Sequence, residues 1–75
     1  MTNRLPATKP RDLIRVLEKR GFYIKRQTGS HAILVNEKLK KAIPVPFHNK
    51  DLKMGTLHGI LKRAGIPPED FKKLR

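Results

Sequence analysis

The 75-residue chain has no cysteine, and it has only six acidic residues against 18 lysines and arginines. Without cysteine it can form neither a disulfide framework nor a thiolate zinc site. Its aromatic residues are one tyrosine and three phenylalanines, scattered along the chain, which is too few for a base-stacking platform of the single-strand-binding kind. A small protein without disulfides or a structural zinc site depends on its apolar core for stability, with help from any partner that binds the folded state.

A chain this short can build one hydrophobic core, so residues 1–75 are expected to form a single domain. The net charge of +12 attracts polyanions, of which nucleic acids are the commonest in a cell. A solubilising surface or an acidic protein partner explains this charge less well. No stretch approaches transmembrane length, and the first ten residues lack the apolar segment of a signal peptide. We therefore expect a soluble, cytoplasmic protein that does not contact a membrane.

Apolar periodicity predicts two helices. The first spans residues 9–20, with Thr8 as its N-cap. The second spans residues 56–64, with Thr56 as its N-cap, and the tail after it is expected to add one short helical turn. A glycine directly follows each predicted helix, where it can end the helix in a left-handed conformation: Gly21 and Gly65.

Three strands are predicted between the helices, over residues 22–27, 31–35 and 41–45. Residues 28–30 form the loop of a hairpin, and a further small strand can lie around Leu5. The predicted fold class is α+β, with a three-stranded antiparallel sheet and two helices packed on one face. This is also the architecture of double-stranded-RNA-binding domains, although a fold does not settle a function.

The residues that could carry chemistry point away from metal-dependent catalysis. The three histidines lack metal-ligand spacing, and we expect neither a metal nor a cofactor. A serine–histidine pair at Ser30 and His31 is excluded, because neighbouring side chains on an extended chain point to opposite sides. The six acids are scattered over predicted helices and turns: Asp12, Glu18, Glu37, Asp51, Glu69 and Asp70.

RNA carries its own nucleophile, the 2′-hydroxyl group, so a metal-free cleavage remains open. One imidazole can accept the proton of that hydroxyl or protonate the leaving oxygen, and cations can stabilise the charged phosphorane. His31 is the first candidate, since it follows the small Gly29 and begins a strand that can hold it rigidly. The competing interpretation of His31 is an ordinary polar residue at a strand start.

For the other polar residues the evidence of a functional role is weaker. His48 is interpreted as a residue that makes a hydrogen bond within its loop. His58 and Lys62 lie on the polar face of the second helix, where solvent or RNA can contact them. Lys50 and Lys53 precede that helix, whose free N–H groups and dipole favour an anion. These two lysines are therefore candidate phosphate ligands. The alternative is that they belong to a basic loop that binds nothing.

Four stretches of the sequence together resemble the HicA toxin family of toxin–antitoxin modules, over about residues 10–71. They are KRGF, GSH at a strand start, IPVPFH and KMGTLHGILKRAGI. The resemblance implies a double-stranded-RNA-binding-like fold, ribonuclease activity on mRNA, and a HicB antitoxin that covers the active surface. It assigns the catalytic role to His31, with Gly29 and Ser30 as its matching neighbours. Further matches lie in the second helix: Gly55, Thr56, Leu57, Ile60 and Leu61.

The leading hypothesis is thus a metal-independent endoribonuclease toxin that uses His31 on mRNA. The predicted RNA-binding residues are Gly29, Ser30, Lys50, Lys53, Thr56, His58 and Lys62. One alternative is a non-catalytic module that binds double-stranded RNA, and another is a cleavage-dead member that contacts DNA only through its antitoxin complex. The chain departs from the family pattern in the apolar, basic stretch AILVNEKLKK and at His58, where arginine is frequent.

Overall fold

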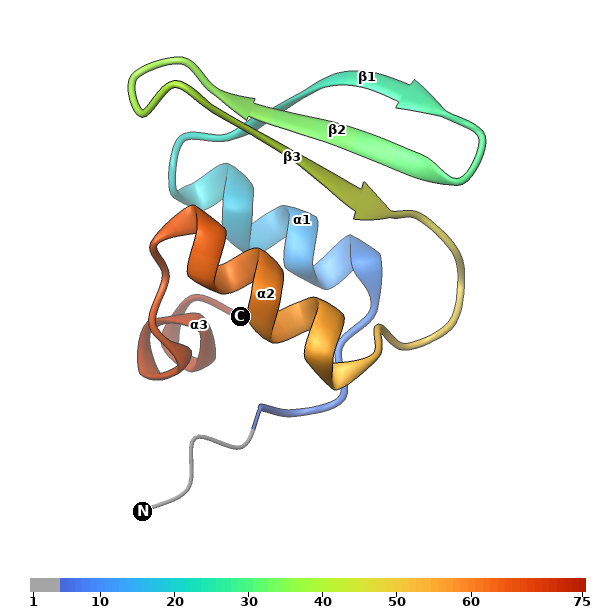
Figure 1. Cartoon of the computed structure of the whole chain (residues 1–75). Coiled ribbons are helices and arrows are strands. Elements are labelled where there is room, and N and C mark those ends of the chain that lie inside the picture. Colours follow the sequence, from blue (N-terminus) through green and yellow to red (C-terminus); the bar gives the residue numbers. More distant parts are fainter. Residues whose placement is uncertain (1–4) are drawn as a thin grey trace.

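Two helices lie on one face of a three-stranded antiparallel sheet in the computed structural model, which describes residues 5–75 (Figure 1). The predicted α+β class is confirmed, and a third helix packs against the first two rather than against the sheet. The elements in chain order are α1 (Pro10–Lys19), β1 (Tyr23–Thr28), β2 (His31–Asn36), β3 (Lys41–Pro46), α2 (Met54–Ala64) and α3 (Pro68–Leu74).

Helix α1 forms as its sequence predicts, except at its cap. Pro10 is its first residue, where a fixed φ suits the first turn and no N–H is needed. The predicted cap at Thr8 is wrong. The residue before the helix is Lys9, which makes no side-chain cap bond, while the buried Thr8 hydroxyl donates a hydrogen bond to the Pro6 carbonyl at 2.7 Å. The chain ahead of α1 turns inward there, so Thr8 is used to hold that turn.

Helix α2 begins two residues earlier than predicted. Its first residue is Met54 and Lys53 precedes it, so Thr56 lies inside the first turn and the predicted Thr56 cap is wrong. Its end is as expected, because Gly65 adopts a left-handed φ of 75° and its N–H donates to the Lys62 carbonyl. Gly21 likewise has a φ of 90° after α1, and both glycines end their helices as predicted.

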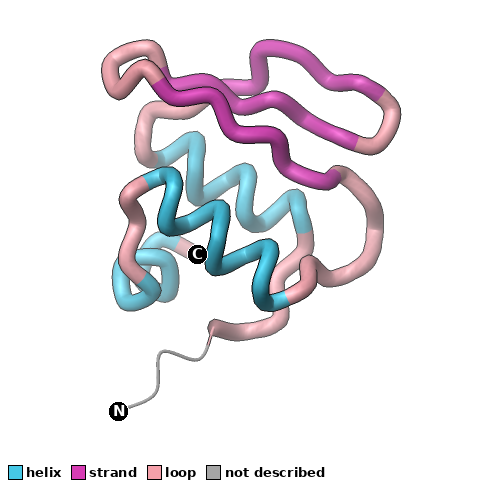
Figure 2. The backbone as a smooth tube through the Cα atoms, viewed as in Figure 1, coloured by secondary structure: helices cyan, strands magenta, loops and turns pink. Residues whose placement is uncertain are grey.

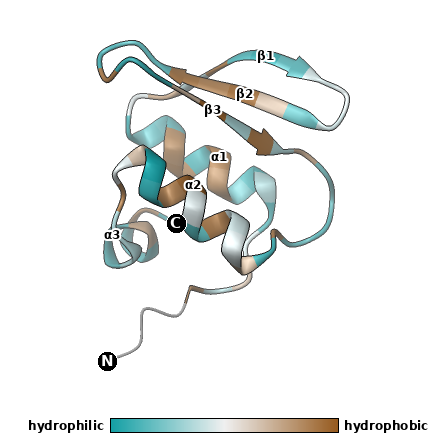
Figure 3. Cartoon of the chain, in the orientation of Figure 1, coloured by the Kyte–Doolittle hydropathy of each residue, from teal (hydrophilic) through white to brown (hydrophobic). Residues whose placement is uncertain are grey.

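The sheet has the order β1–β2–β3, with β2 in the centre (Figure 2). The hairpin turn is the two-residue Gly29–Ser30, one residue shorter than predicted, because Thr28 already pairs with His31. The strand expected around Leu5 is absent from the described residues 5–9, and the segment before them lies outside the described residues; Leu5 packs into the core with 2% of its surface exposed. Figure 3 shows the apolar residues of β2 and β3 above the apolar stripes of α1 and α2.

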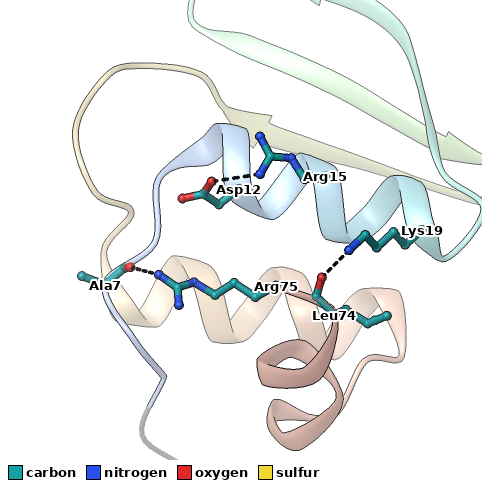
Figure 4. Close-up of polar contacts among 6 residues, drawn as sticks. All are labelled: Ala7, Asp12, Arg15, Lys19, Leu74 and Arg75. Carbon is teal, nitrogen blue, oxygen red and sulfur yellow. Dashed lines mark hydrogen bonds and ion pairs between the residues drawn. The ribbon is translucent and has the colours of Figure 1, made fainter.

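Polar contacts tie α3 and the C-terminus to the start of the chain and to α1 (Figure 4). Lys19 on α1 donates a hydrogen bond to the Leu74 carbonyl at 2.7 Å, and Arg75 reaches the Ala7 carbonyl at 3.4 Å. Arg20 also pairs with Asp70 at 2.8 Å. These contacts hold α3 so that Phe71 is fully buried between the helices, and the predicted short helical turn is in fact a seven-residue helix.

One cluster of apolar side chains fills the space between the sheet and the helices. Its largest fully buried members come from the sheet, from α1 and α2, and from α3. The shared cluster explains how so short a chain holds its sheet and helices in fixed positions. These buried members are Leu13, Val16, Leu17, Leu34, Ile43, Val45, Leu57, Leu61 and Phe71.

Candidate active site

The hairpin turn, the end of β3 and the starts of α1 and α2 all lie at one end of the molecule (Figures 1 and 2). Two backbone hydrogen bonds fix this arrangement. The Phe47 N–H donates to the Ser30 carbonyl at 2.7 Å, which joins the β3 exit to the hairpin turn. The Leu52 N–H donates to the Thr8 carbonyl at 2.8 Å, which joins the loop before α2 to the segment before α1. We call this region the hairpin end.

His31 is the first residue of the central strand, at the hairpin end. It stands directly opposite Thr28 on β1 and Pro46 on β3, so hydrogen-bonded strands flank it on both sides. Its side chain is exposed, while the next residue, Ala32, is fully buried under the helices. Because strand side chains alternate, the imidazole lies on the face of the sheet away from the helices. A substrate can therefore reach the ring, and the paired strand restricts its movement, which is compatible with general acid–base catalysis.

Ser30 and His31 are in contact, contrary to the sequence-based expectation. The Ser30 Oγ lies 3.1 Å from the His31 Nδ1. The expectation assumed an extended chain through both residues, but Ser30 lies in the turn, where side chains do not alternate. A serine hydroxyl can donate or accept, so this contact is compatible with either tautomer of the neutral imidazole. It can therefore orient the ring whether Nε2 serves as a base or as an acid.

Gly29 leaves the space before the hairpin turn open. Its φ is 24°, within the positive range that side chains rarely adopt. A β-carbon built on Gly29 would meet no atom within 4 Å beyond its chain neighbours, so the space on that side of the turn is open.

Lys50, Lys53 and Thr56 are brought together in a shallow hollow beside this turn. Pro46, the partner of His31 across the sheet, lines the same hollow. Lys53 directly precedes α2, whose first turn contains no acidic residue, although Asp51 also lines the hollow and offsets part of the positive charge. Three of the predicted RNA-binding residues therefore line a hollow that extends to Pro46, the strand partner of the predicted catalytic residue.

His58 and Lys62 are not part of that group. Both are exposed on α2 and line a separate hollow near the turn into α3, with Gly65 and Pro67 among its other residues. The structure thus separates the predicted RNA-binding residues into two sets, one next to His31 and one farther along α2.

His48 makes the loop hydrogen bond that its position predicts. Its Nδ1 accepts from the Lys50 N–H at 3.1 Å, which holds the loop before α2. It also lines a hollow with two cations from the start of α1, Lys9 and Arg11. Sequence reasoning gave these two cations no role, because nothing local distinguishes them from other charged residues at a helix start.

The hairpin end is rich in cations that form no ion pair within the described chain. Among residues 5–75 the two ion pairs are Arg15–Asp12 within α1 and Arg20–Asp70 between the end of α1 and α3. No group of three histidines, aspartates or glutamates is placed to hold a metal ion among those residues. The features of the hairpin end are those of an anion-binding surface with an exposed imidazole.

The described helices are all too short or too polar to span a membrane.

Residues 10–66 match a family model described as the HicA toxin of bacterial toxin–antitoxin systems. The matched segment runs from the start of α1 to the residue after Gly65, so it includes the hairpin end and stops before α3. No match is found among the curated proteins.

Proposed function

The chain belongs to the HicA toxin family of bacterial toxin–antitoxin modules, and on that premise we propose that it is an endoribonuclease that cleaves mRNA with His31. The observation that supports this proposal best is the position of His31: exposed, flanked by two strands, and in contact with the Ser30 hydroxyl at 3.1 Å. Flanking strands are common to the residues of β2, so the exposure of the ring and its contact with Ser30 carry the argument.

The proposed reaction uses the 2′-hydroxyl of RNA as nucleophile. Its oxygen attacks the adjacent phosphorus, the bond from phosphorus to the 5′-oxygen breaks, and the products are a 2′,3′-cyclic phosphate and a 5′-hydroxyl. The 2′-hydroxyl loses one proton and the leaving oxygen gains one. His31 acts as the base, the acid or both, and water carries any proton that His31 does not. The nearby lysines stabilise the added negative charge of the phosphorane.

The RNA-binding residues fall into two groups in this proposal. Those beside the catalytic residue are the hairpin residues Gly29 and Ser30 and the α2-start residues Lys50, Lys53 and Thr56. His58 and Lys62, in their separate hollow, contact a more distant part of the same RNA. The protein as proposed needs no metal ion or cofactor for its chemistry.

A toxin of this family has a cognate antitoxin as its partner. We propose that the antitoxin is HicB-like and inhibits the toxin in the cytoplasm by covering His31 or the lysines around it. Any DNA contact is made only through the toxin–antitoxin complex. An inhibited complex that still bound RNA with full affinity would contradict this mode of inhibition.

The deciding experiment compares His31→Ala with the parent protein on a mixed mRNA in EDTA. Loss of a general acid or base should slow cleavage by about 10²–10⁴-fold, below detection for a slow ribonuclease. The exposed side chain should contribute less than about 1 kcal/mol to the free energy of unfolding, so the melting temperature should barely change. Cleavage at the parental rate would refute the assignment, and His48 would become the next candidate.

Ser30→Ala should give a smaller loss of activity than His31→Ala. Losing one exposed hydrogen bond of about 1 kcal/mol should lower the cleavage rate about fivefold, because the ring is less often in its productive orientation. If the parent protein retains RNA but produces no fragments, the protein is a binding module and not an enzyme.

A further inference from the structure

Three rows of side chains cover the face of the sheet that the helices leave free in the described chain, and we call this the open face. Directly opposite residues on neighbouring strands share a face, and Ala32 and Leu34 are fully buried on the other side. The alternate residues of β2 and their partners therefore form the open face. Its rows across β1, β2 and β3 are Thr28–His31–Pro46, Arg26–Ile33–Pro44 and Tyr23–Val35–Ala42.

The chain has too few aromatic residues for an extended stacking platform, but the open face brings one aromatic ring, apolar side chains and a cation onto the same surface as His31. It contains no acidic residue in its three rows, and it carries Arg26 one row away from His31. Ile33 and Val35 are half-buried along its centre. Tyr23 is 41% exposed at its far end, so part of this aromatic residue is accessible there. Apolar and aromatic contacts for bases, beside cations for phosphates, are what surfaces that bind single-stranded nucleic acid use.

A β-bulge decides that Tyr23 belongs to the open face. Counting back from the hairpin by strict alternation would place Tyr23 on the helix side of β1. The register shifts between Ile24 and Arg26, so Lys25 is an extra residue and Tyr23 stands opposite Val35. The Tyr23 hydroxyl then donates to Glu37 Oε2 at 3.0 Å, which fixes the ring at the edge of the sheet.

The proposed chemistry also requires an unpaired substrate at His31. In-line attack places the 2′-oxygen, the phosphorus and the leaving 5′-oxygen on one line. An A-form duplex holds the 2′-oxygen away from that line, whereas a single strand can rotate into it. An imidazole on a flat, open sheet leaves room for that rotated step.

We propose that the open face binds single-stranded RNA, with the scissile step over His31, a neighbouring phosphate at Arg26 and a base stacked on Tyr23. This inference rests on the proposed ribonuclease function and names its substrate class. Val35 is four residues from His31, about 13 Å along the strand, and each row is about 6.6 Å from the next. That step is close to one nucleotide of an extended strand, so the bound segment covers about three nucleotides.

The protein contains a built-in reporter for this contact. Tyr23 is its one tyrosine and it has no tryptophan, so its intrinsic tyrosine fluorescence comes from the open face. Titration of His31→Ala, which should not cut the probe, with a 12-nucleotide single strand should quench this fluorescence as a base stacks on the ring. The same strand annealed to its complement should bind at least tenfold more weakly and quench less. Tight binding of the single strand without quenching would overturn the proposed path, and so would preference for the duplex.

Substitutions then separate the two kinds of contact, all made beside His31→Ala. Tyr23→Leu should lower affinity about tenfold with an unchanged salt slope, whereas Tyr23→Phe keeps the ring and should bind like the parent. Arg26→Ala should reduce the salt slope by about one. The matched control is Lys73→Ala, an equal charge change on α3, and it should alter affinity less than about twofold because salt screens distant charges.

Failure of this inference differs from failure of the ribonuclease itself. If Tyr23→Leu and Arg26→Ala bind and cleave single strands normally while His31→Ala cuts nothing, His31 is catalytic and the RNA path lies elsewhere. If the two substitutions weaken only antitoxin binding, the open face is a protein-docking surface and the inference is wrong. If His31→Ala cuts normally, the proposed function fails before the open face is considered.

Discussion

Replacing Asn36 with alanine should destabilise the protein more than any substitution of an exposed polar residue. Asn36 is the last residue of β2 and is only 5% exposed. Its Nδ2 donates to the Arg20 carbonyl at 3.1 Å, and its Oδ1 accepts from the Leu39 N–H at 3.0 Å. One side chain thereby satisfies a carbonyl at the end of α1 and an N–H in the turn between β2 and β3.

Both contacts vanish in Asn36→Ala, and each is a net gain of about 1 kcal/mol. Since the part-buried Arg20 carbonyl also loses this partner, we expect a loss of about 2–3 kcal/mol in the free energy of unfolding. For a domain of this size, that lowers the melting temperature by about 10–20 °C. Thermal unfolding by circular dichroism measures it, with the exposed Asn49→Ala as control. A drop of less than about 3 °C would show that the two hydrogen bonds do not hold these elements together.

Two further predictions concern charge. Replacing Lys50 and Lys53 together by alanine should weaken binding to all RNA sequences and reduce the salt slope by about two; an unchanged slope would make them an idle basic loop. The hydrogen bond to Glu37, followed by desolvation and the carboxylate charge, raises the pKa of Tyr23 above its ordinary value. An absorbance titration should therefore show a lower Tyr23 pKa in Glu37→Gln. In the parent this contact should stabilise the fold at neutral pH and be lost as pH rises past the ordinary tyrosine pKa.

Periodicity and turn chemistry were sufficient to predict most of the fold. The apolar stripe of α1, the left-handed glycines after α1 and α2, and the antiparallel hairpin around Gly29 all form as predicted. These are local features, and each follows from a few neighbouring residues. Both predicted caps, at Thr8 and Thr56, were wrong, because a threonine before an apolar stripe does not reveal whether its hydroxyl is used elsewhere.

The third helix was underestimated for a different reason. The tail after Gly65 is short and charged, so its own pattern indicates little more than one turn. Its stability comes from residues distant in sequence: Phe71 fills the core, and Lys19 and Arg20 bind its carbonyl and its carboxylate. Contacts across 50 or more residues leave no signature in a local window.

Within the candidate site, the sequence identified the chemical groups but could not show their geometry. The choice of His31 over His48 and His58 came from the surrounding motif, and the structure places it on an exposed face where the two others do not lie. The contact between Ser30 and His31 was excluded from sequence because Ser30 was treated as extended. A two-residue turn removes that restriction, and only the pairing of Thr28 with His31 reveals the turn's length.

The bulge at Lys25 also could not be predicted from the sequence, and it determines which side chains of β1 lie on the open face. Alternation along an unbroken strand would put Tyr23 under the helices and turn Ile24 outward, and nothing in the sequence YIKRQT indicates which residue is extra. With the bulge, the aromatic ring and Arg26 lie on the same face as His31. A catalytic imidazole cuts RNA at a defined step only if something else holds the strand in register with it. If the proposed path is correct, the extra residue in β1 is what gives this toxin a defined cleavage register, because it places the base contact four residues along the sheet from the catalytic group.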